Sequence, residues 1–341
     1  REQVGCNFFR FQLPYLKFEY SLEFGFWNLE FNLFLVSAHS PLSRFQPVLA
    51  LRARILRAIR QFFDTRDFLE VETPVRIAAP AMELRIDAMP AGKAWLRTSP
   101  ELHMKRMLAA GCERVYQLGP CFRQGERGER HNPEFTLLEW YRTNADYRDI
   151  LAETKALIAA VAEAALGRTW LDFSRTHIEL MPVWEVMTVA EAFRTFAGWN
   201  PVEHFDTERF DQDMVNKVEQ NLPTACPVVL MDYPAAVAAL ARRKPEDPRV
   251  AERWELYIGG LEIANAFSEL TDPVEQRERF EACAAQRRTL GRPVYPLDND
   301  FLAALEFGLP SAAGIALGVD RLVMLLAGAA SLDDVLPFRE P

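Results

Sequence analysis

Three arginines crowd a long turn between two apolar runs of the chain. The stretch VYQLGPCFRQGERGERHNPEFTLLEWYRT, residues 115–143, alternates like a buried strand, breaks at a Gly- and charge-rich turn and resumes as a second strand. Arg123, Arg127 and Arg130 lie at this turn. Guanidinium groups match phosphate oxygens bidentately, so arginines held rigidly by a sheet predict a phosphate clamp. An ordinary solvated hairpin tip is the alternative that this stretch alone leaves open.

Three glutamates recur along a second pair of expected strands. Residues 253–272, RWELYIGGLEIANAFSELTD, alternate on both sides of a Gly-Gly pair and carry Glu255, Glu262 and Glu269. Acids on paired strands commonly line a solvated sheet face. If they converge on one cleft instead, they suit Mg²⁺, a hard cation that prefers oxygen ligands and phosphate.

A further carboxylate stands at the start of an expected helix. The sequence SPELHMKRMLAAG, residues 99–111, predicts a helix that Ser99 caps and that has Pro100 at its first position. Glu101, in the first turn, is a favourable charge at a helix N-terminus. It is also placed to direct a carboxylate at a substrate ammonium, and both interpretations stand at this point.

Amphipathic helices and short buried strands must position these groups. Pro47 precedes an amphipathic helix. Its apolar face comprises Leu51, Ile55, Ile59, Phe62 and Phe63, and its outer face Arg52, Arg54, Arg57 and Arg60. Helical patterns recur through residues 146–223, and PVVLMDYP, ending at Pro234, predicts a buried strand. Residues 272–291 predict a surface helix.

Composition limits the class of protein. The 341 residues are 49% hydrophobic and 26% charged, which is typical of a globular protein with a large core. No apolar run is long and uncharged enough to span a bilayer, which argues against a membrane-embedded protein. We expect a cytoplasmic protein, because its cysteines show no disulfide or metal pattern. The net charge of -9 argues against a nucleic-acid partner, which usually requires a basic face. Five scattered cysteines predict reduced thiols.

Three stretches together resemble the class II aminoacyl-tRNA synthetases, and specifically their lysyl branch. FRQGERGERHNPEFTLLEWY, residues 122–141, is similar to motif 2 of that branch, and GIALGVDRLVMLLAG, residues 314–328, is similar to motif 3. The helix through Ile55 and Ile59, followed by FLEVETP ending at Pro74, is similar to motif 1. The resemblance covers roughly residues 51–338 and implies a homodimer interface at motif 1.

The resemblance implies an α+β fold with an antiparallel sheet flanked by helices. It places the catalytic domain at residues 46–341, after an aromatic-rich N-terminal extension at residues 1–45. We expect no anticodon-binding barrel in this chain, because 45 residues are too few for its five strands.

The implied chemistry is activation of an amino acid as its adenylate, with ATP and Mg²⁺. The substrate carboxylate is already ionised near neutral pH, so no protein nucleophile or base is needed. The protein must position the reactants and neutralise charge on the phosphorus oxygens. The implied catalytic residues are Arg123 and Arg321, and the implied Mg²⁺ ligands are Glu255 and Glu262. The implied ATP-binding residues are Arg123, Gln124, Gly125, Asn132, Phe135, Glu262, Ile263, Gly318 and Arg321.

The implied amino-acid pocket is acidic. Its residues would be Ser99, Pro100, Glu101, Glu139, Tyr141, Asn265, Phe267, Glu269 and Ala316. Several acids suit a lysine-like substrate with two ammonium groups, because a neutral side chain would leave those acids unpaired. One departure from the family pattern concerns the ATP loop: motif 2 has an acid where this chain has Gly125, and Glu126 follows one place later.

Two features resemble the stand-alone paralogues that ligate (R)-β-lysine to a lysine of translation elongation factor P. One is the missing barrel, and the other is Ala316, where lysyl-tRNA synthetases generally carry glycine. Its methyl group should favour an isomer with a shifted amino group by about 1–3 kcal/mol. This ligase, acting on (R)-β-lysine or lysine, is the leading hypothesis, and tRNA is not expected as a partner. The alternatives are a lysyl-tRNA synthetase catalytic core that charges tRNA and an inactive synthetase-like binding module.

Overall fold

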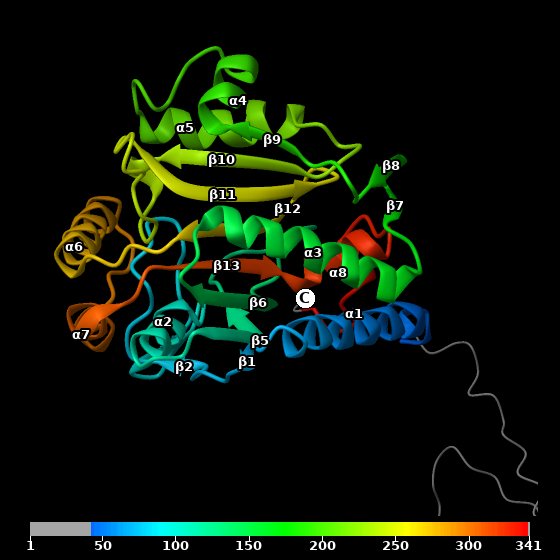
Figure 1. Cartoon of the computed structure of the whole chain (residues 1–341), viewed down its shortest axis with the longest axis horizontal. Helices are drawn as coiled ribbons and strands as arrows, with labels where there is room; N and C mark the ends of the chain where they lie inside the picture. Colours follow the sequence, from blue (N-terminus) through cyan, green and yellow to red (C-terminus); the bar gives the residue numbers. More distant parts are fainter. Residues whose placement is uncertain (1–41, 340–341) are drawn as a thin grey trace, which may run out of the picture. The chain divides into compact units, whose positions relative to one another are not determined.

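The main sheet has eight strands and is antiparallel through its middle. The computed structural model describes residues 42–339, where the strand order is β1-β5-β6-β13-β12-β11-β10-β9 (Figure 1). The strands are β1 Leu69–Glu70, β5 Arg114–Phe122, β6 Glu134–Thr143, β9 Glu185–Thr188, β10 Val228–Pro234, β11 Val250–Ile258, β12 Leu261–Ser268 and β13 Ala312–Gly318. The edge pairs β1–β5 and β9–β10 are parallel. The predicted α+β fold is confirmed, and its parallel edges make the sheet mixed.

Two small sheets accompany the main one. Strand β4 (Ala94–Leu96) pairs with both β2 (Arg76–Ile77) and β3 (Pro90–Ala91). A hairpin of β7 (Trp170–Phe173) and β8 (Thr176–Glu179) forms the other. The first of these sheets carries the chain from β1 to the helix that follows it, so it helps to place the start of that helix beside β5 and β6.

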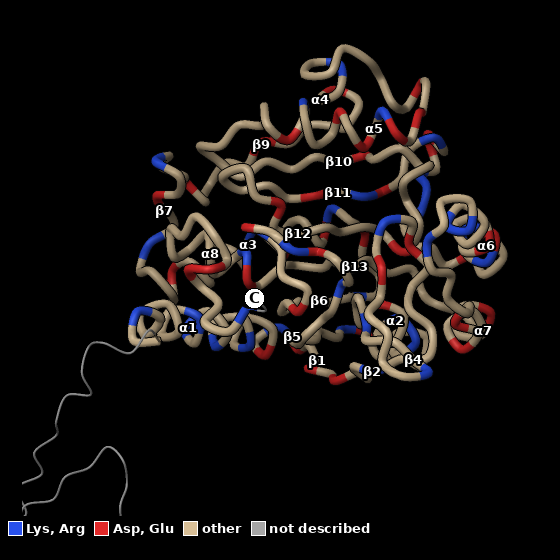
Figure 2. The backbone as a smooth tube through the Cα atoms, turned by 180° about the vertical axis from the view of Figure 1, so that it is seen from behind, with Lys and Arg blue, Asp and Glu red and all other residues tan. Residues whose placement is uncertain are grey.

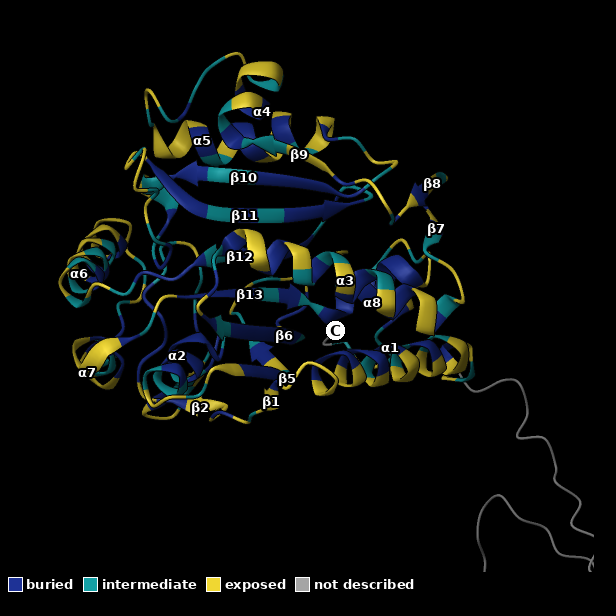
Figure 3. Ribbon diagram, in the orientation of Figure 1, coloured by how far each residue is buried: buried dark blue, intermediate teal, exposed yellow. Residues whose placement is uncertain are grey.

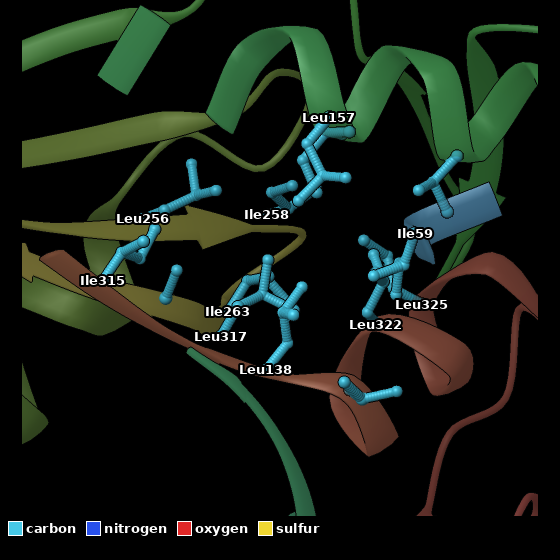
Figure 4. Packing of buried hydrophobic residues seen from close by; sticks show 14 of the residues in the cluster. Ile59, Leu138, Leu157, Leu256, Ile258, Ile263, Ile315, Leu317, Leu322 and Leu325 are labelled. Carbon is cyan, nitrogen blue, oxygen red and sulfur yellow. The ribbon is translucent and has the colours of Figure 1, made fainter. Parts of the chain in front are cut away.

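Three helices cover one face of the main sheet. They are α1 (Gln46–Asp64), α3 (Tyr147–Leu166) and α8 (Val319–Leu326). Their apolar side chains and those of the strands beneath form the largest core cluster (Figure 4). The predicted apolar face of α1 is confirmed, because Ile55 and Ile59 are fully buried. Each such side chain contributes about 1.5–3 kcal/mol through burial.

One arginine of α1 does not lie on the outer face, and the prediction for it was wrong. Arg52 donates to Asp320 Oδ1 at 2.6 Å and to Thr136 Oγ1 at 2.8 Å. The other oxygen of Asp320 accepts from the backbone N–H of Thr136 at 2.8 Å. Arg52 therefore ties α1 to α8 and to β6.

The remaining helices lie around the opposite face and the ends of the sheet. Helix α2 (Glu101–Ala109) packs against β5 and β6, and α7 (Asn299–Gly308) packs against α2 and against α6 (Pro273–Thr289). Helices α4 (Val189–Phe196) and α5 (Thr207–Asp213) lie beside β9 and β10 (Figure 1). The central strands are mostly buried, whereas α6 and α7 expose much of their surface (Figure 3). Helix α6 is nevertheless more than a surface helix, because the Arg287 side chain is fully buried.

Two predictions concern the ends and the environment of the chain. Of the predicted extension over residues 1–45, residues 1–41 lie outside the described part of the chain. Ser43–Phe45 form a short 3₁₀ helix before α1. Within residues 42–339, none of the helices combines the length and the apolar character that a bilayer crossing requires.

Candidate active site

Alternation along β6 separates the core from the candidate site. Leu138 and Trp140 belong to the core cluster beneath the helices, so Glu139 between them points to the other face. In the register of the sheet Glu139 lies opposite Ala316 of β13, and Ala316 lies opposite Asn265 of β12. Residues directly opposite one another on antiparallel strands share a face. The three side chains therefore form one row across the sheet.

A second row follows two residues along each strand. Tyr141 lies opposite Gly314, and Gly314 lies opposite Phe267. A Cβ at position 314 would overlap the Tyr141 ring and come within 2.8 Å of Glu269 Oε1. Glycine is therefore required at this position, because only its missing side chain leaves room for the tyrosine and the carboxylate.

These rows form the base of a pocket that is open to solvent at its mouth. Its lining residues are Glu83, Ser99, Glu101, Arg123, Glu139, Tyr141, residues 237–241, Arg253, Asn265, Phe267, Ile315 and Ala316. Charged positions also occur on β11, which lies between β12 and β10 in the same sheet (Figure 2). Most of the predicted amino-acid pocket is thus brought together. Pro100 and Glu269 are outside the lining, and Pro100 immediately precedes α2 rather than occupying its first position.

Glu139 lies at the base of the pocket within a hydrogen-bonded group. Ser99 Oγ donates to its Oε1 at 2.7 Å, and Tyr141 Oη donates to its Oε2 at 2.8 Å. Burial, with a smaller contribution from Glu101, raises the pKa of Glu139 to about 8. This carboxyl group is therefore mostly protonated at neutral pH, and a cation in the pocket would favour release of the proton.

A buried lysine joins two of the predicted acids. Lys105 Nζ lies 2.5 Å from Glu101 Oε1 and also contacts Glu269 Oε2 as an ion pair. Burial raises the pKa of Glu269 to about 8, and Lys105 counteracts this rise. Among the described residues, neither Glu269 oxygen accepts a well-directed hydrogen bond, which leaves this buried carboxylate able to accept one from a ligand. Sequence reasoning missed Lys105, although its place four residues after Glu101 on one helix was a usable signal.

Arg123 also lines the pocket and has one donor unused. Its Nε is buried and has no acceptor within the described part of the chain. The guanidinium group stands 5.1 Å from the centre of the Phe135 ring, and Glu126 Oε2 lies 3.7 Å from its Nη1. Gly125 adopts a φ of 79°, a conformation that favours glycine, and this turn brings Glu126 back toward the arginine. An unsatisfied, buried guanidinium donor fits a phosphate oxygen.

Arg321 and Glu262 form a second polar group beside the loop of residues 123–133. Arg321 Nη1 donates to the Glu262 carbonyl at 2.8 Å and to its Oε2 at 3.2 Å, and Nη2 lies 2.6 Å from His131 Nε2. Gly318, the residue before α8, lies close to the Arg321 side chain and to the Ile263 carbonyl. Four of the predicted ATP-binding residues therefore lie together.

The two predicted Mg²⁺ ligands differ in how far they are already satisfied. The Glu255 oxygens accept from Arg253 at 2.5 Å, from Tyr233 at 2.6 Å and from Tyr257 at 2.8 Å. Burial, together with Glu255, raises the pKa of Glu262. A divalent cation would relieve the repulsion between the two carboxylates, so the donor set fits Mg²⁺ with phosphate oxygens as further ligands.

Within residues 42–339, protein side chains alone do not complete a metal site. Among residues 42–339, no three His, Cys, Asp or Glu side chains are arranged to hold a metal ion. Glu219 is the nearest candidate that sequence reasoning missed: burial, with Glu255 and Glu262, raises its pKa to about 7. Any Mg²⁺ held here would therefore depend on substrate oxygens.

Asn132 and Gln124 are engaged within the loop. Asn132 Nδ2 donates to the Glu134 carbonyl at 2.6 Å, and its Oδ1 accepts from Arg339 Nε at 3.2 Å. The backbone N–H of Gln124 donates to the Asp87 carbonyl at 2.7 Å. The predicted contact of Asn132 with ATP would have to replace or share these bonds.

Sequence reasoning also missed two charged residues of the pocket lining. Glu83 lies on the irregular segment between β2 and β3, where no periodicity could identify its direction. Arg253 lies on β11, where alternation with Glu255 placed it on the acidic face, but the prediction considered only the acids.

Comparison with known proteins agrees with this geometry. Residues 39–340 match the family described as tRNA synthetases class II (D, K and N). The chain is 38% identical over 317 residues to a lysine–tRNA ligase of Pelotomaculum thermopropionicum and 38% identical over 318 residues to one of Bacillus subtilis. These alignments cover 85% and 84% of the chain but 63% and 62% of the relatives, so the chain spans less than two thirds of their length. The chain therefore belongs to the class II tRNA synthetases of the D, K and N group.

Proposed function

We propose that this chain activates lysine or a lysine isomer with ATP, forming the aminoacyl adenylate and pyrophosphate. The observation that carries the proposal is one pocket that joins Glu101 and Glu139 to Arg123, with Glu269 connected through Lys105. The carboxylates suit ammonium groups, and the unsatisfied guanidinium donor suits the phosphate and the substrate carboxylate.

The reaction would use positioning and charge neutralisation. A carboxylate oxygen of the amino acid attacks the α-phosphorus, a new P–O bond forms, and the bond to the bridging oxygen breaks as pyrophosphate leaves. Arg123 would stabilise charge on the α-phosphate, Arg321 would bind the γ-phosphate, and Phe135 would stack on adenine. Mg²⁺, when bound, would neutralise further phosphate charge, and Glu262 with Glu255 would hold it.

Two acceptors are compatible with this adenylate. The similar relatives are named lysine–tRNA ligases, which favours tRNA, so the expectation that tRNA is not a partner finds no support there. The Ala316 methyl group at the base of the pocket favours the second candidate, in which (R)-β-lysine is transferred to a lysine of elongation factor P. In that case the partner amine attacks the adenylate carbonyl and AMP leaves. The catalytic domain at residues 46–341 and a homodimer through motif 1 belong to both proposals.

A parallel assay tests the proposal and separates the acceptors. The protein is incubated with ATP and either lysine or (R)-β-lysine, first with pyrophosphate to measure exchange, then with tRNA or elongation factor P. We expect exchange with at least one isomer, and its absence with both would favour an inactive binding module. Charged tRNA without labelled factor would select the first acceptor, and the reverse would select the second. Ala316→Gly should shift the ratio of kcat/KM values toward α-lysine by about 5- to 100-fold.

Binding of the diamino acid should strengthen as the pH rises from 6 to 8. Burial raises the pKa of Glu139 to about 8, so this carboxyl group is largely protonated at pH 6. An ammonium group binds the ionised carboxylate. For each carboxyl group that must lose its proton on binding, the affinity can rise by as much as about tenfold per pH unit. The Kd for lysine, measured by calorimetry at pH 6, 7 and 8, should fall by about tenfold or more. A flat or rising Kd would contradict the assignment, and Glu139→Gln should weaken the dependence.

A further inference from the structure

The segment between β2 and β3 is held in place by a buried arginine of α6. Arg287, whose side chain has no solvent exposure, contacts the Glu83 carbonyl, donates to the Ile86 carbonyl at 2.9 Å and pairs with Asp87 at 2.5 Å. A fully desolvated guanidinium that satisfies several carbonyls fixes the backbone it contacts. The backbone at Glu83 is therefore rigidly placed at the pocket wall.

Two further contacts connect this segment to its surroundings. The Ala88 N–H donates to Tyr295 Oη at 2.8 Å, and Arg292 Nη1 donates to the Leu84 carbonyl at 2.8 Å. The Asp87 carbonyl accepts from the N–H of Gln124, next to Arg123. The segment that carries Glu83 is thus joined directly to the loop of the predicted ATP site.

The Glu83 side chain lines the pocket, and within residues 42–339 it has neither a hydrogen bond nor an ion pair. Burial, followed by the charge of Glu101, raises its pKa to about 7, and Arg123 and Arg253 act in the opposite direction. A carboxyl group without a partner in a pocket wall is costly to keep unless a ligand satisfies it.

The charged groups also give the pocket a direction. Glu101 pairs with Lys105, which also pairs with Glu269, and the charges of Glu101 and Arg123 both act on Glu83. If the substrate carboxylate lies at Arg123, the amino group closest to it in the molecule is near Glu83 and Glu101. The distant ammonium group then lies toward Glu269.

We infer that Glu83 is a substrate-binding residue that accepts the ammonium group nearest to the reacting carboxylate. This inference rests on the proposed lysine activation and adds a second acid beside Glu101. With both Glu83 and Glu101 nearby, the ammonium group can find an acidic partner whether it is attached to the α-carbon or to the β-carbon of the substrate. Glu83 therefore contributes to tolerance of, or preference for, the β-amino isomer. Glu83→Gln keeps the shape of the side chain and removes its charge.

The test compares lysine with 6-aminohexanoic acid, which retains the carboxylate and the distant ammonium group but lacks the nearer one. The Kd of each compound is measured by calorimetry, and KM by ATP–pyrophosphate exchange. Glu83→Gln should raise the Kd and KM for the preferred lysine isomer by about tenfold and change the Kd of 6-aminohexanoic acid less than twofold. Glu281→Gln, an exposed glutamate of α6, is the matched control and should leave all values unchanged.

Proton release gives a second readout that needs lysine alone. Calorimetry in buffers of different ionisation enthalpy counts the protons released on binding, and Glu83→Gln should release fewer near pH 7 than the unmodified protein. Unchanged affinity together with unchanged proton release would overturn the inference, as would equal weakening of lysine and 6-aminohexanoic acid. If the unmodified protein binds no lysine isomer and shows no exchange, the proposed function itself fails, which is a different result.

Discussion

Replacing Arg123 with alanine should lower lysine-dependent ATP–pyrophosphate exchange by about 10²–10³-fold, as removal of one preorganised donor to a developing negative charge commonly does. Arg123 lines the pocket, and its buried Nε has no acceptor within the described residues. This donor is therefore available to the α-phosphate. Because this interaction would strengthen in the transition state, kcat should fall more than KM rises.

Two further variants make the Arg123 experiment specific. Arg123→Lys keeps the charge but loses the planar pair of donors, so it should recover only part of the exchange rate. Arg114→Ala removes an arginine at the exposed start of the same strand, β5, and should leave the rate unchanged. Exchange by Arg123→Ala within about threefold of the unmodified protein would exclude the proposed role, provided that circular dichroism shows an intact fold.

Arg287→Ala should lower the free energy of unfolding by about 3–5 kcal/mol, the range expected when one member of a buried charge pair is removed. Arg287 is fully buried, and its loss leaves Asp87 Oδ1 and the carbonyls of Glu83 and Ile86 without this donor. Denaturation by urea, followed by fluorescence and circular dichroism, measures the change.

Arg288, the exposed neighbour on the same helix, provides the control. Its replacement by alanine should change the free energy by less than about 0.5 kcal/mol. Similar values for the two variants would show that Arg287 is not essential for stability.

Alternation made much of the sheet predictable. The apolar runs on both sides of the arginine-rich turn became β5 and β6, and the glutamate-bearing stretch became β11 and β12. A period of two assigns Glu139 and Leu138 to opposite faces without any structure. The apolar face of α1 was predictable for the same kind of reason, because a period near 3.6 identifies the buried side of a helix.

The rest depended on contacts between distant parts of the chain. Nothing in the local pattern placed Arg52 of α1 against Asp320, 268 residues later in the sequence. The direction of Glu83 depends on Arg287, some 200 residues away, and a helix with many exposed charges gave no sign that one arginine was buried. Parallel pairing at both edges of the sheet likewise depends on strand order, which periodicity does not report.

The face alternation of β6 limits where evolution can change the length of this chain. The turn at Gly125 tolerates a shift of one residue, which here places Glu126 rather than residue 125 beside Arg123. The turn can do this because its side chains do not have to alternate between two faces of a sheet. Inserting one residue in β6 would instead reverse the faces of these side chains, so that Glu139 would point into the apolar core and Leu138 into the pocket. Gains and losses of residues in the lineage should therefore collect in the turn and spare the strand.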